Sequence, residues 1–356
     1  MIRFGPSGIP LSCKGRTLRD GIEDVHNLGL TAMEVQLVRV NLNERYATDD
    51  DIGRAPREIP GELIVQIGRR EDRKEILVSS LDATIEKGDV LYSLAAGIAD
   101  DYAELADLGT LARELDIELS LHTPYYMDLA DADGLATKSI DSIRWGGMLA
   151  HAMGASIVVT HLGMFGELAS KEALARIAKS LRALRDAFKR AKIAPRLGVE
   201  ASGRQEVVGS LEEVVALAKA VPGIVPVLNF AHVHARGFGS LKRPEDFADV
   251  FAKIRRFSGG HMHAHFSGVE HADGNELRYT PIKKGDLRFE PLAECLLDGD
   301  YDLTLVSSSP LLEHDAMYMK VILERVLAKR LVRPSKPEKP ERPEKPPRTE
   351  KEARRR

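Results

Sequence analysis

Histidines are concentrated in one short segment of this sequence. Residues 261–271, HMHAHFSGVEH, contain His261, His263, His265 and His271, whereas the whole chain of 356 residues has eleven histidines. Imidazole nitrogens are common protein ligands for zinc and related transition metals. The segment is consistent with a built metal site, but also with a weak surface metal trap or with a strand that ends in polar residues. Which interpretation holds depends on the other ligand-type residues of the chain.

Other residues of ligand type stand where predicted strands end. They are His122, His161, Glu200, Asn229, His232 and His265. Two histidines and one glutamate from three successive strands would hold a zinc, manganese or iron ion and leave coordination positions open. Open positions are what metal-assisted catalysis needs. We therefore predict a metal centre built on His122, His161 and Glu200, and we assign the catalytic roles to Glu200 and His161.

A barrel of parallel strands would bring these residues together. Apolar runs, several of them rich in β-branched residues, lie at residues 2–4, 32–38, 117–122, 156–161, 196–200, 225–230, 261–266 and 302–307. Nearly continuous apolar runs are typical of parallel strands that are buried on both faces. Helical patterns separate the runs, and one of them starts with Ser210 and Glu213 spaced as a capping box. The pattern predicts an α/β fold of the (β/α)8 TIM barrel type, in which all strands end at one rim.

In such a barrel, the histidine-rich segment would be a strand whose histidine side chains point to one side. In a strand, His261, His263 and His265 share one face. That face would point into the barrel, so the row could descend from the rim into the interior. We expect His265 to lie at the rim and the other two to be polar residues of the strand.

Two segments do not fit the repeating pattern. Residues 40–98 lengthen the loop after the second strand and contain strand-like runs at 61–68, 74–81 and 88–95, so we expect a small β-rich insertion there. Residues 333–356 carry proline at every third position from 334 to 346 and have almost no apolar residues. Such a segment cannot join a core and is expected to be a disordered tail. The barrel domain is therefore assigned to residues 1–332.

Composition excludes several classes of protein. No apolar run approaches the roughly 18 residues of a membrane span, and the N-terminus lacks the pattern of a secretory signal, so we expect no membrane contact. Cys13 and Cys295 are the only cysteines, which excludes a disulfide framework and indicates a reducing cytoplasm. Residues 1–332 carry 41 basic and 49 acidic residues, a net charge of −8, whereas the tail has a net charge of +5. An acidic barrel would contact nucleic acid only through a local basic patch.

Six segments together resemble one known family. The segments are HTPYYMDLA, THLGMFG, GVEASGRQEVVGSL, NFAHVHARGFG, HAHFSG and SSSPLLEHDA. In order and spacing they resemble the metal-site segments of the endonuclease IV family. Members of that family are the family-2 apurinic/apyrimidinic endonucleases, which have xylose-isomerase-like barrels. The archaeal branch is the most similar. The resemblance implies three zinc ions and cleavage of the DNA backbone 5′ to an abasic site. It implies that His122, His161 and Glu200 hold the first metal. Glu200 would bridge to a second metal bound by His265, and His232 would bind a third.

The sequence departs from the family pattern at the second and third metals. Asn229 replaces an aspartate ligand, and Ser308 replaces a glutamate ligand. In the loop after the seventh strand, Leu277 and Tyr279 stand where the family has an aspartate and a histidine, although His271 lies nearby. Loss of carboxylates makes a multiply charged cluster harder to hold. We therefore expect one zinc ion or two, with Asn229 and His271 as weaker ligands.

The resemblance and the charges also indicate residues that could contact a substrate. By resemblance, Tyr125 helps to open the DNA and Arg39 lies in a loop that contacts DNA. Arg236 and Lys283 could bind phosphates, or they are solvated surface charges. DNA is therefore the expected partner.

Three functions are open at this point. The first is a metal-dependent phosphodiesterase of the endonuclease IV type that acts on abasic or damaged DNA. The second is a mononuclear, metal-dependent isomerase or epimerase of a small sugar, because the same barrel fold hosts such enzymes. The third is a non-catalytic metal-containing protein that binds a partner through its tail. The first would need at least two metals and a positive groove, and the second would need one metal in a closed pocket.

Overall fold

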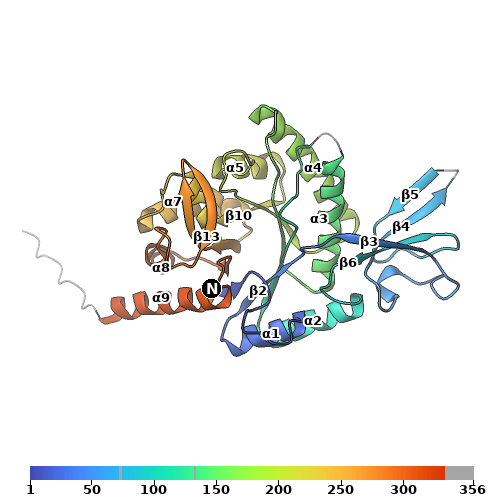
Figure 1. Cartoon of the computed structure of the whole chain (residues 1–356), viewed down its shortest axis with the longest axis horizontal. Helices are drawn as coiled ribbons and strands as arrows, with labels where there is room; N and C mark the ends of the chain where they lie inside the picture. The colour runs from blue at the N-terminus through green and yellow to red at the C-terminus, as the bar shows by residue number, and fades with distance from the viewer. Residues whose placement is uncertain (72–73, 132–133, 333–356) are drawn as a thin grey trace, which may run out of the picture.

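The centre of the molecule is a barrel of eight parallel strands (Figure 1). The computed structural model describes residues 1–71, 74–131 and 134–332. The barrel strands are β1 (Ile2–Pro6), β2 (Ala32–Gln36), β7 (Glu118–His122), β8 (Ile157–Thr160), β9 (Arg196–Glu200), β10 (Ile224–Asn229), β11 (Met262–Phe266) and β14 (Leu303–Ser307). They are hydrogen-bonded in the order β1-β14-β11-β10-β9-β8-β7-β2, and a parallel bridge between Ser7 and Glu34 joins the two edge strands. The barrel is therefore nearly closed, which confirms the predicted fold class.

Helices surround the barrel and bury their apolar faces against it (Figure 1). They are α1 (Leu18–Asn27), α2 (Tyr102–Glu114), α3 (Leu135–Ala152), α4 (Ser170–Arg190), α5 (Leu211–Ala220), α6 (Phe230–Arg236), α7 (Pro244–Ile254), α8 (Phe289–Asp298) and α9 (Glu313–Val332), with short 3-10 helices at Pro56–Glu58 and Arg255–Phe257. In α4, Ala173, Ile177 and Leu181 are buried at a spacing of four, as expected for one helical face. The predicted capping box is present, because Ser210 accepts from the Glu213 backbone at the start of α5.

The insertion after β2 folds as an antiparallel sheet. Its strands are β3 (Asn41–Tyr46), β4 (Ile64–Glu71), β5 (Lys74–Val78) and β6 (Val90–Ala95), in the order β3-β6-β4-β5. It has a small apolar core of its own, made by Ile59, Ile64, Ile67, Ile85 and Leu91. The sequence predicted β4, β5 and β6 but not β3, because NLNERY has no apolar run. In Figure 1 the sheet projects from one side of the barrel.

A second, smaller hairpin follows β11 and was not predicted. Strands β12 (Gly268–Ala272) and β13 (Asn275–Thr280) pair antiparallel. The two residues between them, Asp273 and Gly274, both have positive φ, 51° and 73°. Asp-Gly is the sequence that a two-residue turn of this type favours, because both positions need a left-handed backbone. The hairpin packs against α6 and brings β13 to the rim.

The remaining expectations concern the membrane and the tail. Within residues 1–71, 74–131 and 134–332, no helix combines the length and the apolar character that crossing a membrane requires. The expected tail, residues 333–356, lies outside the described residues.

Candidate functional site

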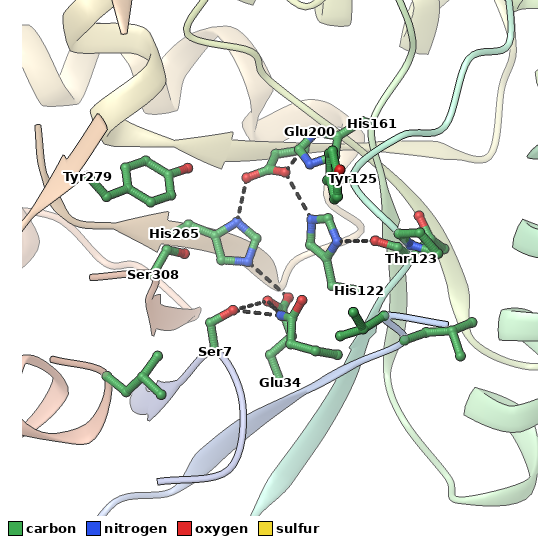
Figure 2. A pocket seen from close by; sticks show the side chains of 15 residues that line it. Ser7, Glu34, His122, Thr123, Tyr125, His161, Glu200, His265, Tyr279 and Ser308 are labelled. Atoms are coloured by element: carbon green, nitrogen blue, oxygen red, sulfur yellow. Dashed lines mark hydrogen bonds and ion pairs between the residues drawn. The ribbon is translucent and has the colours of Figure 1, made fainter. Parts of the chain in front are cut away.

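Three residues predicted as a metal centre meet at the rim. His122 ends β7, His161 directly follows β8 and Glu200 ends β9. Glu200 Oε2 lies 3.0 Å from His122 Nε2 and 3.3 Å from His161 Nδ1 (Figure 2). One ligand atom from each of the three residues lies within 4.8 Å of the other two. The strand ends therefore place the rim trio, His122, His161 and Glu200, as the sequence analysis expected.

The hydrogen bonds of His122 leave its inner nitrogen free to bind a cation. His122 Nδ1 lies 2.7 Å from the carbonyl oxygen of Thr123, so Nδ1 must carry a proton and donate it (Figure 2). In a neutral ring, Nε2 then presents a lone pair to the Glu200 carboxylate, and two acceptors face each other across 3.0 Å. A proton or a metal ion between them relieves the repulsion. Ligand atoms of a tetrahedral zinc site lie roughly 3.3 Å apart, so the spacing of the rim trio fits a divalent ion.

Electrostatics at the trio favour ionised Glu200. Burial opposes its ionisation, but the nearby charges of His265 and His161 and the hydrogen bonds from histidine hold the pKa of Glu200 well below its usual range. Burial alone would lower the pKa of His122, yet its hydrogen bond to Glu200 raises that pKa above its ordinary value. A deprotonated carboxylate is the form that binds a metal.

Glu34 is a site residue that the sequence analysis missed. It lies in β2 and is fully buried. Its Oε1 accepts hydrogen bonds from Ser7 Oγ and from Gln36 Nε2, each at 2.9 Å. An acidic residue inside the buried run AMEVQLV was the available signal, because a buried carboxylate needs partners of its own. As a pattern, the run predicts only a buried strand.

His265 is held between two carboxylates. Its Nδ1 lies 2.9 Å from Glu200 Oε1, and its Nε2 lies 2.9 Å from Glu34 Oε2 (Figure 2). Burial alone would lower the pKa of His265, but the charges of Glu34 and Glu200 raise it to about 10. With this raised pKa the ring is protonated on both nitrogens, so Nε2–H donates to Glu34 and Nδ1–H donates to Glu200, and His265 holds the Glu200 carboxylate in place. Carboxylate–histidine pairs of this kind commonly orient metal ligands.

His263 and His261 continue the row from His265 away from the rim. His263 is fully buried, and its Nε2 lies 3.4 Å from Glu34 Oε2. His261 lies at the opposite end of the barrel, 3.3 Å from Glu118 and 3.2 Å from Asp302. The row therefore runs along one face of β11 from the rim into the interior, as the strand periodicity indicated.

Asn229 supports Glu200 instead of offering a ligand oxygen. Its Nδ2 donates to Glu200 Oε1 at 2.9 Å and to the Tyr279 hydroxyl at 2.8 Å. Its Oδ1 accepts from the backbone N–H of His232 and so caps α6. Because a carboxylate only accepts hydrogen bonds, the amide must turn its nitrogen towards Glu200. The amide nitrogen faces the rim trio and the amide oxygen caps α6, so Asn229 does not present the ligand oxygen that the sequence analysis expected.

His232 belongs to a neighbouring polar group on the hairpin side of the rim. Its Nδ1 donates to the Ala201 carbonyl at 2.6 Å, and its Nε2 lies 2.6 Å from the Tyr279 hydroxyl and 2.8 Å from Glu276 Oε2. Glu276 comes from β13 and was also missed by the sequence analysis. The unrecognised Asp-Gly turn, which creates the hairpin, was the signal for it.

The rim trio opens into a cavity of about 280 Å³ (Figure 2). Tyr125, which is 81% exposed, lies at its mouth, and Ser308 lies on its wall. Among the described residues that line it, none is a lysine or an arginine, and none belongs to the insertion. The lining residues are Ser7, Glu34, Gln36, Leu37, Val38, His122, Thr123, Pro124, Tyr125, His161, Glu200, His265, Tyr279, Ser308 and Leu312.

His271, expected as a displaced metal ligand, belongs to a different group. It lies in β12, where its Nε2 is 3.2 Å from Asp286 Oδ2 and its ring centre is 5.1 Å from that of His234. We call His234, His271 and Asp286 the outer cluster. The hairpin turns His271 towards α6, so it lines no part of the cavity at the rim trio.

The expected substrate contacts have different surroundings. Arg236 is mostly buried and donates to the carbonyl oxygens of Arg204 and Val207, so its guanidinium is structural and not a phosphate contact. Lys283 is exposed and lies over the Tyr318 ring, 4.4 Å from its centre. Arg39 is exposed in the loop after β2 and lines a pocket beside the cavity.

Comparisons with known proteins agree with this architecture. Residues 87–310 match the family model described as xylose isomerase-like TIM barrel. An uncharacterized protein of Methanocaldococcus jannaschii is 26% identical over 226 residues, which cover 62% of this chain and 80% of that protein. The structure of endonuclease IV from Thermus thermophilus is similar with a TM-score of 0.57 at 18% identity, over 91% of this chain and 99% of that one. The structure of an L-ribulose 3-epimerase has a TM-score of 0.55 at 14% identity, over 95% and 100%. At these identities the two structures share the fold with this chain.

Proposed function

Because this chain belongs to the xylose isomerase-like TIM barrel family, we propose that the rim trio is the metal centre of a hydrolase that cleaves phosphodiester bonds in abasic or damaged DNA. The observation that carries the proposal is the convergence of His122 Nε2, His161 Nδ1 and Glu200 Oε2 at ligand spacing. A further support is the shared fold with an endonuclease IV structure. Zinc suits these ligands best, and manganese or iron can be held by the same set.

The residues of the chain would each contribute a defined part. A divalent ion in the rim trio would supply Lewis-acid chemistry at a phosphoryl group. Glu200 would remain bound to His265 through its second oxygen, and Glu34 would keep His265 in place. Tyr125, exposed at the mouth, would stack on a base or sugar next to the scissile bond. A cavity of about 280 Å³ admits a single nucleotide unit but not a duplex, so the reacting unit would have to leave the base stack.

The lining of the cavity also supports a second candidate function. No described residue that lines it is a lysine or an arginine, and residues 1–332 have a net negative charge. Such a cavity suits a neutral molecule of sugar size, as in a mononuclear isomerase or epimerase, and an epimerase structure has the same fold. The third candidate, a non-catalytic binding protein, would bind metal without turnover of either substrate.

A cleavage assay on the full-length chain tests the proposal. The protein is loaded separately with zinc, manganese and ferrous iron and incubated with a duplex oligonucleotide that contains one abasic site. We expect cleavage on the 5′ side of that site, lost in Glu200→Ala and kept in Glu206→Ala, which changes an exposed glutamate outside the cavity. Metal-loaded protein that leaves the oligonucleotide intact would contradict the proposal. Deuterium exchange from D2O into a ketose, followed by proton NMR, would then identify an epimerase.

A further inference from the structure

A second pocket lies beside the cavity of the rim trio. It has a volume of about 460 Å³, and Gln36 and Val38 line both pockets, so the two are direct neighbours. Its walls are mainly apolar and include Ile9, Leu18, Met33, Val35, Val38 and Ile98. The cavity of the rim trio is lined by two carboxylates and three histidines, whereas the walls of its neighbour are mainly apolar.

Two arginines are the charged side chains among the described residues that line the second pocket. Arg16 and Arg39 are both exposed, and neither forms an ion pair within residues 1–71, 74–131 and 134–332. Arg16 donates one hydrogen bond, from Nη1 to the Pro10 carbonyl at 3.3 Å, which leaves other N–H groups available. In a barrel domain with an excess of acidic residues, two guanidinium groups without carboxylate partners at one apolar pocket can donate hydrogen bonds to an anion.

The insertion supplies one wall of this pocket. Ala96, Gly97 and Ile98, the residues that directly follow β6, line it together with residues of the loops after β1 and β2. The insertion therefore forms part of a pocket at the rim of the barrel, although it lines no part of the cavity at the rim trio. It encloses space next to that cavity and leaves the metal centre uncovered.

We propose that the second pocket binds a nucleoside phosphate unit, with its base against the apolar walls and its phosphate at Arg16 and Arg39. A nucleotide matches the pocket because it combines a flat, largely apolar ring with a group that guanidinium binds through paired hydrogen bonds. The unit would be part of the substrate that the rim trio cleaves, and in this respect the inference rests on the proposed function. Binding itself needs no metal, so it can be tested separately.

Calorimetric titration of the full-length chain tests the pocket, first as purified and then after chelation of metal. The probes are adenosine monophosphate, adenosine, inorganic phosphate and a short single-stranded oligonucleotide with a 5′-phosphate. We expect the monophosphate to bind with or without metal, and at least tenfold more tightly than adenosine or phosphate alone. Tighter binding of the oligonucleotide than of the monophosphate would assign the unit to the end of a nucleic acid, and equal binding would assign it to a free nucleotide. Both results support the pocket.

Matched variants locate the binding. Arg16→Gln and Arg39→Gln should each weaken the monophosphate about tenfold or more, because each removes charge-assisted hydrogen bonds. Arg19→Gln, which changes an exposed arginine of α1 outside the pocket lining, should leave affinity unchanged. Ala96→Phe should block the apolar part, whereas Ala95→Phe, one residue away and outside the lining, should not. Absence of binding at millimolar monophosphate, or binding insensitive to Arg16→Gln and Arg39→Gln, would overturn the proposal whatever the cleavage assay shows.

Discussion

The rim trio and the outer cluster contain the same residue types, two histidines and one carboxylate, yet they differ in the partner of one ring nitrogen. At the rim, His122 Nδ1 donates to the backbone carbonyl of Thr123. In the outer cluster, His234 Nδ1 accepts the backbone N–H of Leu241 at 3.1 Å. The first contact places the ring proton on Nδ1, and the second forces it onto Nε2. In the neutral rings, the inner nitrogen is therefore a lone pair in His122 and an N–H group in His234.

This difference determines what each group can bind. His122 Nε2 can give its lone pair to a cation that Glu200 shares. His234 Nε2 carries a proton and lies 3.2 Å from Asp286 Oδ1, so it faces the carboxylate as a donor and cannot also be a metal ligand. A histidine, a second histidine and a carboxylate within reach of one another are thus insufficient for a metal site. The group behind the ring has to accept a hydrogen bond, as the Thr123 carbonyl does behind His122.

The largest expected effect is at Glu200. Glu200→Ala removes the carboxylate on which both rim histidines converge, so zinc affinity should fall by more than about 100-fold, beyond the usual effect of losing an outer partner. Competition with a fluorescent chelator measures the affinity. Glu206→Ala is the control, because Glu206 is exposed and outside the cavity. Equal zinc affinity in the two variants would show that the rim trio does not bind the zinc ion.

A smaller effect on zinc affinity is expected at Glu34, which contacts His265 and not the rim trio. Glu34→Gln keeps the shape of the side chain but weakens its hold on His265, and zinc affinity should fall roughly 10- to 100-fold. The matched control is Glu118→Gln at the opposite end of the barrel, where Glu118 accepts from Ser156 and Thr304. That variant should lose stability and keep its zinc affinity. The same chelator titration, together with thermal unfolding, separates the two effects.

In the insertion, the Asp51 carboxylate pairs with Arg45, which stays charged at every pH used. Asp51 accepts hydrogen bonds from Arg45, and these hold the pKa of Asp51 well below its usual range despite its burial. A carboxyl group with a lowered folded-state pKa stabilises the fold above about pH 4, its unfolded value, and loses that contribution as the pH falls. We expect the sheet β3–β6 to lose about 1–3 kcal/mol of stability in Asp51→Asn at pH 7. The difference between variant and wild type should disappear at low pH.

Hydrogen exchange by mass spectrometry measures this effect. Amides of the insertion should exchange faster in Asp51→Asn at pH 7, while those of β8 and β9 in the barrel should not change. Uniform acceleration across the whole chain would show that the insertion and the barrel unfold as one unit.

The smallest effect is expected at the outer cluster. Asp286 is 57% exposed, so solvent screens its contacts with His234 and His271. Asp286→Asn should cost less than about 1 kcal/mol of unfolding free energy. Urea unfolding of the variant checks this value, and a loss of several kcal/mol on addition of a chelator to wild type but not to the variant would point to a metal at the outer cluster.

The fold and the rim trio were predictable because both follow from strand ends. Buried parallel strands read as apolar runs, and His122, His161 and Glu200 each stand where such a run stops. Strand β3 was not predictable in this way, because its six residues, NLNERY, are polar and mostly exposed. Its place depends on pairing with β6, which is a contact between residues far apart in the sequence.

The missed site residues have two different causes. Glu34 was hidden inside an apolar run, and only the three-dimensional structure reveals that Ser7, Gln36 and His265 surround it. Glu276 was missed because the Asp-Gly turn before it was not used to predict a hairpin. The surroundings of Arg236 could not be predicted at all, since whether backbone carbonyls satisfy a guanidinium depends on loops that meet only in the fold.

Metal content is the most direct measurement of the difference between the two clusters. Elemental mass spectrometry of the full-length chain, of Glu200→Ala and of Asp286→Ala counts the zinc ions retained after dialysis. We expect one or two ions per chain in the wild type, the same number in Asp286→Ala and none in Glu200→Ala. Zinc that persists in Glu200→Ala and disappears in Asp286→Ala would contradict the account, because it would place the metal at the cluster whose histidine presents a proton.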